Sequence, residues 1–172
     1  MIRQSLALLA LLVLAACGDE FSHETLKVDL GAVVAAGRAV PVDGVTSAGQ
    51  PDEAAFRVFA ESGYKTVIDM RMPNENRGLE EAAFVESLGM SYLPLPTSGD
   101  TITFDQARRL EELIEASDGP VLVHCASANR VGALLALGDY AENGDLERAL
   151  ETGREGGLTR LEGAVKKAIE AE

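Results

Sequence analysis

Short apolar runs alternate with amphipathic segments along most of the chain. Runs rich in β-branched and other apolar residues predict strands over residues 45–49, 66–70, 91–95 and from 121 onward. Pro94 lacks an amide proton and favours an edge position for the third of these strands. Between the strands, apolar residues recur at helical spacing, and many of these segments start at capping residues or end at glycines. The predicted helices begin near residues 51, 79, 103, 131, 145 and 159.

This alternation predicts an α/β fold with a small parallel sheet of about four strands and helices on both faces. Thr103 and Gln106 have the spacing of a capping box at the start of one helix. The 172 residues are enough for a single domain with a substantial core.

The N-terminal residues have a different pattern and are expected to lie outside the fold. Arg3 precedes an apolar stretch at residues 6–14 that is too short for a stable membrane span, as in a signal peptide. Residues 14–17, Leu-Ala-Ala-Cys, resemble a bacterial lipobox, which implies lipidation of Cys17. The alternative is an ordinary secretory signal. We expect a signal peptide at 1–16, a tether and irregular lead-in at 17–44, and the domain at 45–172.

The formal net charge of −13 changes the range of possible partners. Such a field repels nucleic acids and other large polyanions. A phosphate site must therefore be local, made of backbone dipoles and a few arginines, which suits a small or single phosphoester. The two histidines and two cysteines form no metal-ligand spacing, so we expect no metal or cofactor.

Residues 121–132 combine a buried strand, a turn of small residues and a helix rich in Ala and Leu. The amides of Ala126, Ser127, Ala128 and Asn129, with the helix N-terminus, would converge on one point and favour an anion there. Arg130 adds planar donors that suit a tetrahedral oxyanion. Cys125 at the base of this turn would have a lowered pKa and act as a nucleophile. If Cys17 is lipidated, Cys125 is the only remaining thiol and forms no disulfide within the chain.

The sequence His124-Cys125, followed by Arg130 after four intervening residues, resembles the signature of cysteine-dependent phosphatases. Tyrosine and dual-specificity phosphatases have five intervening residues. The shorter spacing resembles the phosphatase-like domain of beta-lactamase hydrolase-like proteins and the rhodanese sulfurtransferases. Three further stretches resemble the first of these families: residues 47–52, 63–71 and 156–162.

This resemblance implies a phosphatase that forms a thiophosphate on Cys125, and such a reaction needs an acid for the leaving oxygen. Asp100 is the best candidate, because its loop is expected to overhang the site. Arg71 is a candidate for a second positive contact, held by Asp69 or Glu75. We interpret His124 as a core histidine that orients the turn.

Two positions depart from the phosphatase pattern. Ala128 stands where glycine is usual, and a positive φ there would strain it by about 1–2 kcal/mol. Val131 replaces a hydroxyl residue that would stabilise the leaving thiolate. Two alternatives therefore stay open: a sulfurtransferase that works through a persulfide on Cys125, and a non-catalytic anion-binding protein. In each case we expect an exported protein on the periplasmic face of a bacterial membrane, held by its N-terminal lipid. Its substrate is expected to be a phosphate- or sulfur-containing small molecule or protein.

Overall fold

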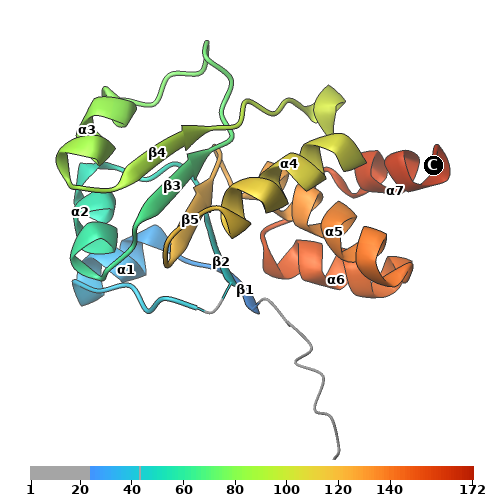
Figure 1. Cartoon of the computed structure of the whole chain (residues 1–172), viewed down its shortest axis with the longest axis horizontal. Helices are drawn as coiled ribbons and strands as arrows, with labels where there is room; N and C mark the ends of the chain where they lie inside the picture. Colours follow the sequence, from blue (N-terminus) through green and yellow to red (C-terminus); the bar gives the residue numbers. More distant parts are fainter. Residues whose placement is uncertain (1–23, 43) are drawn as a thin grey trace, which may run out of the picture.

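The computed structural model describes residues 24–42 and 44–172, which form a parallel sheet between two groups of helices (Figure 1). The sheet has five strands in the order β1-β2-β5-β3-β4. The strands are β1 (Glu24–Lys27), β2 (Gly44–Ala48), β3 (Thr66–Asp69), β4 (Ser91–Pro94) and β5 (Val121–His124). The α/β class and the edge position of the strand that contains Pro94 are confirmed.

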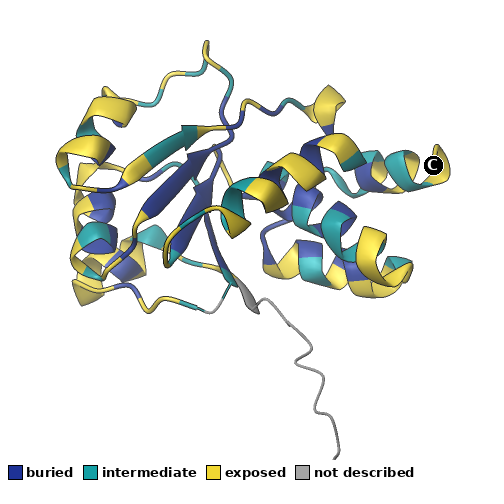
Figure 2. Ribbon diagram, in the orientation of Figure 1, coloured by how far each residue is buried: buried dark blue, intermediate teal, exposed yellow. Residues whose placement is uncertain are grey.

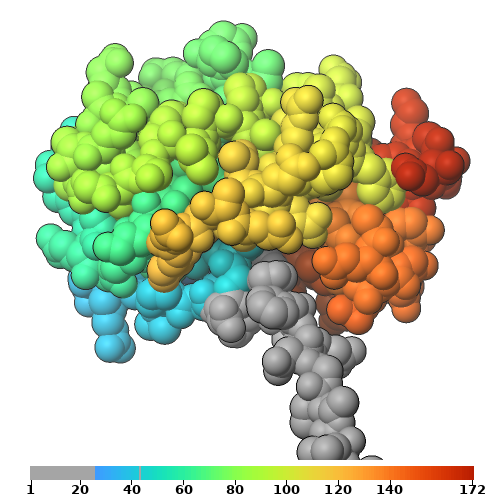
Figure 3. Space-filling model, viewed as in Figure 1, coloured from blue at the N-terminus to red at the C-terminus, as the bar shows by residue number. Residues whose placement is uncertain are grey.

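Three helices contribute to the core on one face of the sheet and the remaining helices cover the other face. The first group consists of α1 (Leu30–Ala36), α2 (Glu53–Glu61) and α3 (Glu81–Ser87). The second group consists of α4 (Phe104–Glu115), α5 (Asn129–Asn143), α6 (Leu146–Glu155) and α7 (Glu162–Glu170), with a short 3-10 helix, η1 (Gly99–Thr101), before α4. In the space-filling view, the C-terminal helices form one lobe beside the sheet (Figure 3).

The sheet has one strand more than the approximately four expected, because part of the segment expected to be an irregular lead-in forms β1 and α1. β1 pairs in parallel with β2, from Glu24 opposite Gly44 to Lys27 opposite Ser47. β1 has the sequence Glu-Thr-Leu-Lys, with a single apolar residue, so it leaves a weak hydrophobic pattern. In α1, Gly37 does not break the helix but ends it, with a left-handed φ of 63°. The signal peptide and Cys17 lie outside the described residues.

Side chains fix several helix starts as the sequence indicates. Asp52 caps α2 by accepting a hydrogen bond from the amide of Ala55 at 2.8 Å. Thr103 likewise accepts from the amide of Gln106 at 3.2 Å. The reciprocal bond, from the Thr103 amide to the side-chain oxygen of Gln106, is not formed, and the Gln106 side chain points to the preceding loop, where its Nε2 donates to Pro96 O and Thr97 Oγ1. The capping box prediction is therefore half right at this helix.

The core lies on both faces of the central strands (Figure 2). Phe56 and Phe59 on α2 are fully buried, and each contributes about 1.5–3 kcal/mol through removal from water. On the other face, α5 and α6 approach so closely that a Cβ on Gly132 would lie 2.3 Å from the carbonyl oxygen of Gly153. Within the described residues, no helix has the length and apolar character needed to cross a membrane.

Candidate active site

Cys125 follows the carboxyl end of β5, where ligands bind in parallel sheets, and it is 1% exposed. The turn after it is held against the end of β2. The amide of Cys125 donates to Ala48 O, and the amide of Gln50 donates to Ala126 O, each at 3.4 Å. A Cβ on Gly49 would lie 3.3 Å from Ala126 O, so this approach leaves little room for a side chain. Residues within the motif at 47–52 therefore pack directly against the turn.

Ala128 has a φ of 64° and is the one non-glycine residue with positive φ in the described chain. The turn thus has the geometry that the sequence analysis considered, with an expected strain of about 1–2 kcal/mol. The methyl group of Ala128 faces Gly157, where an added Cβ would lie only 2.6 Å from it. Glycine at position 157 therefore makes room for alanine at position 128.

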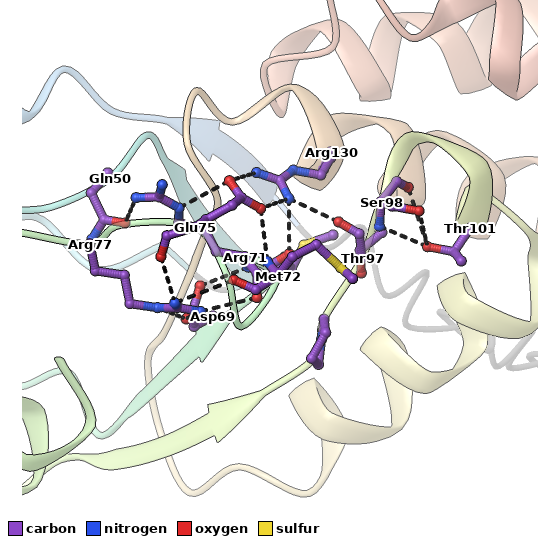
Figure 4. Close-up of polar contacts among 12 residues, drawn as sticks. Gln50, Asp69, Arg71, Met72, Glu75, Arg77, Thr97, Ser98, Thr101 and Arg130 are labelled. Atoms are coloured by element: carbon purple, nitrogen blue, oxygen red, sulfur yellow. Dashed lines mark hydrogen bonds and ion pairs between the residues drawn. The ribbon is translucent and has the colours of Figure 1, made fainter. Parts of the chain in front are cut away.

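Arg130, in the first turn of α5, forms a bidentate ion pair with Glu75 (Figure 4). Its Nη1 and Nη2 donate to the two carboxylate oxygens at 2.6 and 2.8 Å, and Nη1 also donates to Thr97 O at 2.9 Å. The hydrogen bond to Arg130 lowers the pKa of Glu75 to about 2. The hydrogen bond to Glu75 raises the pKa of Arg130. Glu75 therefore fixes a permanently charged guanidinium beside the thiol.

Arg71 is buried in the same network as Arg130. Its Nε donates to Glu75 Oε2 at 3.2 Å, and its Nη1 donates to Gln50 Oε1. Its amide donates to Asp69 Oδ1 at 2.8 Å. The prediction that Asp69 or Glu75 holds Arg71 is confirmed, and Glu75 is shared between two arginines.

His124, Asp69 and Glu81 form a fully buried cluster beneath the turn. His124 Nε2 lies 2.9 Å from Glu81 Oε1, and because a carboxylate only accepts, we assign the proton to Nε2. Asp69 also accepts from Arg77 and from Tyr92 at 2.6 Å, and burial with this bond raises the pKa of Tyr92.

The ligand atoms of His124, Asp69 and Glu81 lie within 4.8 Å of one another, a spacing that a metal ion could bridge. The oxygens, however, already accept from protein donors, since Gln50 donates to Glu81 and Arg77 to Asp69. A guanidinium bonded to one carboxylate also repels a cation. The arrangement fits a hydrogen-bonded cluster that supports the turn, as expected of a core histidine at position 124.

Asn129 has a structural role in addition to the expected contribution of its backbone amide. Its side-chain oxygen accepts three hydrogen bonds from the segment after α6: from the Thr159 amide at 2.7 Å, the Thr159 hydroxyl at 3.1 Å and the Arg160 amide at 3.0 Å. Ser47 Oγ also donates to Gly156 O at 2.6 Å. The side chain of Asn129 therefore supports the site, and only its backbone is available to an anion. Ala126 and Ser127 are exposed, as an anion-binding turn requires.

Asp100 lies on η1 and is exposed. Its amide donates to Ser98 Oγ at 3.3 Å, and its carboxylate makes no hydrogen bond to the Cys125 turn. A Cβ on the preceding Gly99 would lie 3.8 Å from Leu161 Cδ2, so η1 borders the same C-terminal segment that Asn129 holds. The structure thus joins Cys125, Arg130 and Arg71 in one site and places Asp100 on a separate loop.

Sequence reasoning missed the roles of Gln50 and Glu81 and the use of Thr97 O as an acceptor for Arg130. Gln50 lies in a motif shared with the related family, which is a usable signal. Glu81 is one of many acidic residues in the chain, and its burial (2% exposed) follows only from the tertiary fold.

A parallel sheet in which one strand ends at a cysteine, followed by an amide-lined turn and an arginine on the next helix, defines the cysteine-dependent phosphatase class. Residues 38–141 match the family described as beta-lactamase hydrolase-like protein, phosphatase-like domain. The chain belongs to this family. Membership and fold together support a hydrolase of the phosphatase type.

Relatives by sequence are the beta-lactamase hydrolase-like proteins of Agrobacterium fabrum and Xylella fastidiosa. The first is 33% identical over 109 residues, which cover 61% of this chain and 25% of that protein. The second is 33% identical over 98 residues, which cover 55% of this chain and 23% of that protein. The alignment therefore spans about a quarter of each relative.

Solved structures share the fold at lower sequence identity. A candidate phosphatase from Neisseria meningitidis has a TM-score of 0.64 at 20% identity, covering 74% of this chain and 93% of that one. TpbA of P. aeruginosa has a TM-score of 0.60 at 20% identity, covering 78% and 89%. A cysteine-to-serine variant of TpbA in complex with phosphotyrosine has a TM-score of 0.56 at 21% identity, covering 74% and 84%.

Proposed function

We propose that the protein is a cysteine-dependent phosphatase that hydrolyses phosphomonoesters through a thiophosphate on Cys125. The thiolate attacks phosphorus, and the bond to the leaving oxygen breaks. The turn amides and Arg130 hold the equatorial oxygens. Water then attacks the thiophosphate, which releases phosphate and restores the thiolate. The observation that carries this proposal is the position of Cys125 at the base of the turn, with a charged Arg130 fixed beside it by Glu75.

The direct test is hydrolysis of phenyl phosphate and of a phosphotyrosine peptide, the latter chosen because TpbA was crystallised with phosphotyrosine. We expect Cys125→Ser to abolish turnover and Arg130→Ala to reduce kcat by about 10²–10³-fold. Arg130→Lys should restore charge without the planar pair of donors and recover little activity. The matched control is Arg148→Ala on α6, which removes an arginine that is paired with Asp139 of α5. Equal activity of wild type and Cys125→Ser would refute the nucleophile.

We propose Asp100 as the acid that protonates the leaving oxygen and later accepts the proton of the attacking water. Its exposed position on η1 would let it approach a bound ester. Asp100→Asn should reduce kcat/KM, which covers the steps up to release of the leaving group, by about 10²-fold or more on phenyl phosphate. The loss should be far smaller on 4-nitrophenyl phosphate, whose leaving group needs no proton. Asp105→Asn, on the exposed first turn of α4, is the control. An equal loss of kcat/KM on both substrates would exclude the acid role of Asp100.

A second candidate is a non-catalytic anion-binding protein, favoured by the left-handed Ala128 and by the buried Val131 after the arginine. It predicts phosphate binding without turnover of any ester. The four-residue spacing of the signature also motivates a sulfurtransferase. That reading predicts a sulfur adduct on Cys125 after thiosulfate treatment, detected by mass spectrometry, and transfer of this sulfur to cyanide.

We also propose that the protein is exported and anchored by a lipid on Cys17, from the sequence of its first residues. Mass spectrometry of the mature N-terminus tests this directly, since lipidation adds acyl groups to a new N-terminal cysteine. Cys17→Ser should release the protein into the soluble periplasmic fraction. Retention of residues 1–16 in the mature protein would refute the proposal.

A further inference from the structure

We propose that Arg160 and Lys27 form a second anion-binding subsite beside the Cys125 turn, so that the protein prefers phosphomonoesters that carry a second acidic group. This inference rests on the proposed phosphatase function and adds a substrate class to it. It does not involve the atoms that hold the reacting phosphate.

The segment that carries Arg160 is fixed to the turn by the fold. The amide of Arg160 donates to Asn129 Oδ1 at 3.0 Å, and Asn129 directly follows the turn. The neighbouring Thr159 makes two more bonds to the same oxygen. Arg160 itself is exposed. Its backbone position is therefore set by the active-site turn, while its guanidinium is free to meet a ligand.

Lys27 reaches the same place from another element. It is the last residue of β1, so it lies at the carboxyl edge of the sheet, where Cys125 also lies. A Cβ on Gly157 would lie 3.0 Å from Lys27 Cδ and 2.6 Å from the Ala128 methyl. The stem of Lys27 and the methyl group of Ala128 thus both lie next to the place that a side chain on Gly157 would occupy. Lys27 is exposed.

Arg160 is one of two described arginines that lack a counterion. Among the described residues, every arginine except Arg38 and Arg160 forms an ion pair with a carboxylate. Lys27 likewise forms no ion pair within this part of the chain. In a protein of net charge −13, two unpaired cations beside the turn are a local concentration of positive charge.

The paired arginines explain why a second acidic group would bind on this side. Arg130 and Arg71 share Glu75, and Arg77 is paired with Asp69. Their carboxylate partners largely neutralise these arginines. They therefore offer little positive charge to a second acidic group of a substrate whose phosphate is held by the turn. A second acidic group directed toward Arg71 would meet Glu75, whereas one directed toward Arg160 and Lys27 would meet uncompensated positive charge.

The test compares phenyl phosphate with 1,3-phenylene bisphosphate and 3-carboxyphenyl phosphate. Wild type should favour the doubly acidic substrates in kcat/KM. Arg160→Gln should reduce this preference about threefold to fivefold, which corresponds to the loss of an exposed ion pair. Lys27→Gln should act in the same direction, and added salt should weaken the preference. If wild type prefers only the bisphosphate over phenyl phosphate, the subsite is specific for a second phosphate. If wild type prefers both doubly acidic compounds, the subsite accepts acidic groups in general.

Arg38→Gln is the matched control, since Arg38 is also exposed and unpaired but follows the C-terminal end of α1, at the opposite edge of the sheet. The proposal is overturned if Arg38→Gln lowers the preference as much as Arg160→Gln, or if Arg160→Gln lowers kcat/KM equally for all three compounds. Failure of the subsite proposal is distinguished from failure of the phosphatase function by calorimetry. The Cys125→Ser variant is titrated with phenyl phosphate and with the bisphosphate, so that binding is measured without turnover. Tighter bisphosphate binding that needs Arg160 supports the subsite even without turnover, and equal binding refutes it.

Discussion

Glu75→Gln tests the network that orients Arg130. The substitution keeps the size of the side chain and removes the charge that two buried arginines share. A pKa that falls from 4.5 to about 2 corresponds to about 3 kcal/mol of differential interaction at neutral pH. Because the Glu75 side chain is 26% exposed, solvent screening reduces the expected loss of unfolding free energy to about 2 kcal/mol.

The loss should depend on pH with a defined sign. The pKa of Glu75 is lower in the folded state, so its contribution is fully present above pH 4.5 and is lost as the pH falls toward 2. At pH 3, less than half of the contribution at pH 7 should remain. Wild type and Glu75→Gln should therefore differ by about 2 kcal/mol at pH 7 and by under about 1 kcal/mol at pH 3 in urea unfolding.

Glu53→Gln is the matched control, because it removes the same charge from an exposed pair with Arg57 at 3.2 Å. It should cost at most about 0.5 kcal/mol at either pH. If Glu75→Gln costs no more than Glu53→Gln, or if its cost is the same at pH 7 and pH 3, the ion pair does not hold Arg130 as we describe.

Two further predictions concern backbone positions. Gly132→Ala should destabilise the protein by about 1–3 kcal/mol or more in urea unfolding, because its Cβ would lie 2.3 Å from Gly153 O. The control is Gly163→Ala, where an added Cβ would have no atom within 4 Å, and this substitution should be neutral or stabilising. Ala128→Gly should relieve a left-handed φ and raise the unfolding free energy by up to about 1 kcal/mol, whereas Ala126→Gly in the same turn should lower it. A loss on Ala128→Gly as large as that on Ala126→Gly would show that contact with Gly157 outweighs the strain.

The sequence predicts most of the fold because its central strands carry strong local signals. β3 and β5 are short β-branched or aliphatic runs that are buried on both faces. Asp52 and Thr103 cap α2 and α4, the helices that precede these two strands. β1 escaped prediction because its sequence, Glu-Thr-Leu-Lys, has one apolar residue in four. Its position depends on β2, twenty residues later in register, and local patterns do not report such a pairing.

The candidate site was predictable where its chemistry is local. Cys125, the turn and Arg130 lie within six positions, so one motif reveals them. The partners of these residues were not predictable in the same way. Glu75 reaches Arg130 across 55 positions, and Glu81 reaches His124 across 43. In a chain with 28 acidic residues, only the tertiary fold selects these two.

The contact between the turn and residues 156–160 has a consequence for anyone who recombines this domain. The segment that matches the family spans residues 38–141, so it contains Cys125, Asn129 and Arg130. It lacks Lys27, Gly157 and the three donors that Asn129 accepts. A chimera cut at the borders of the matched segment would contain the Cys125 turn and Arg130 but not the residues that pack against the turn and hold Asn129. We therefore expect a chimera that preserves the site to need the residues from β1 through the start of α7.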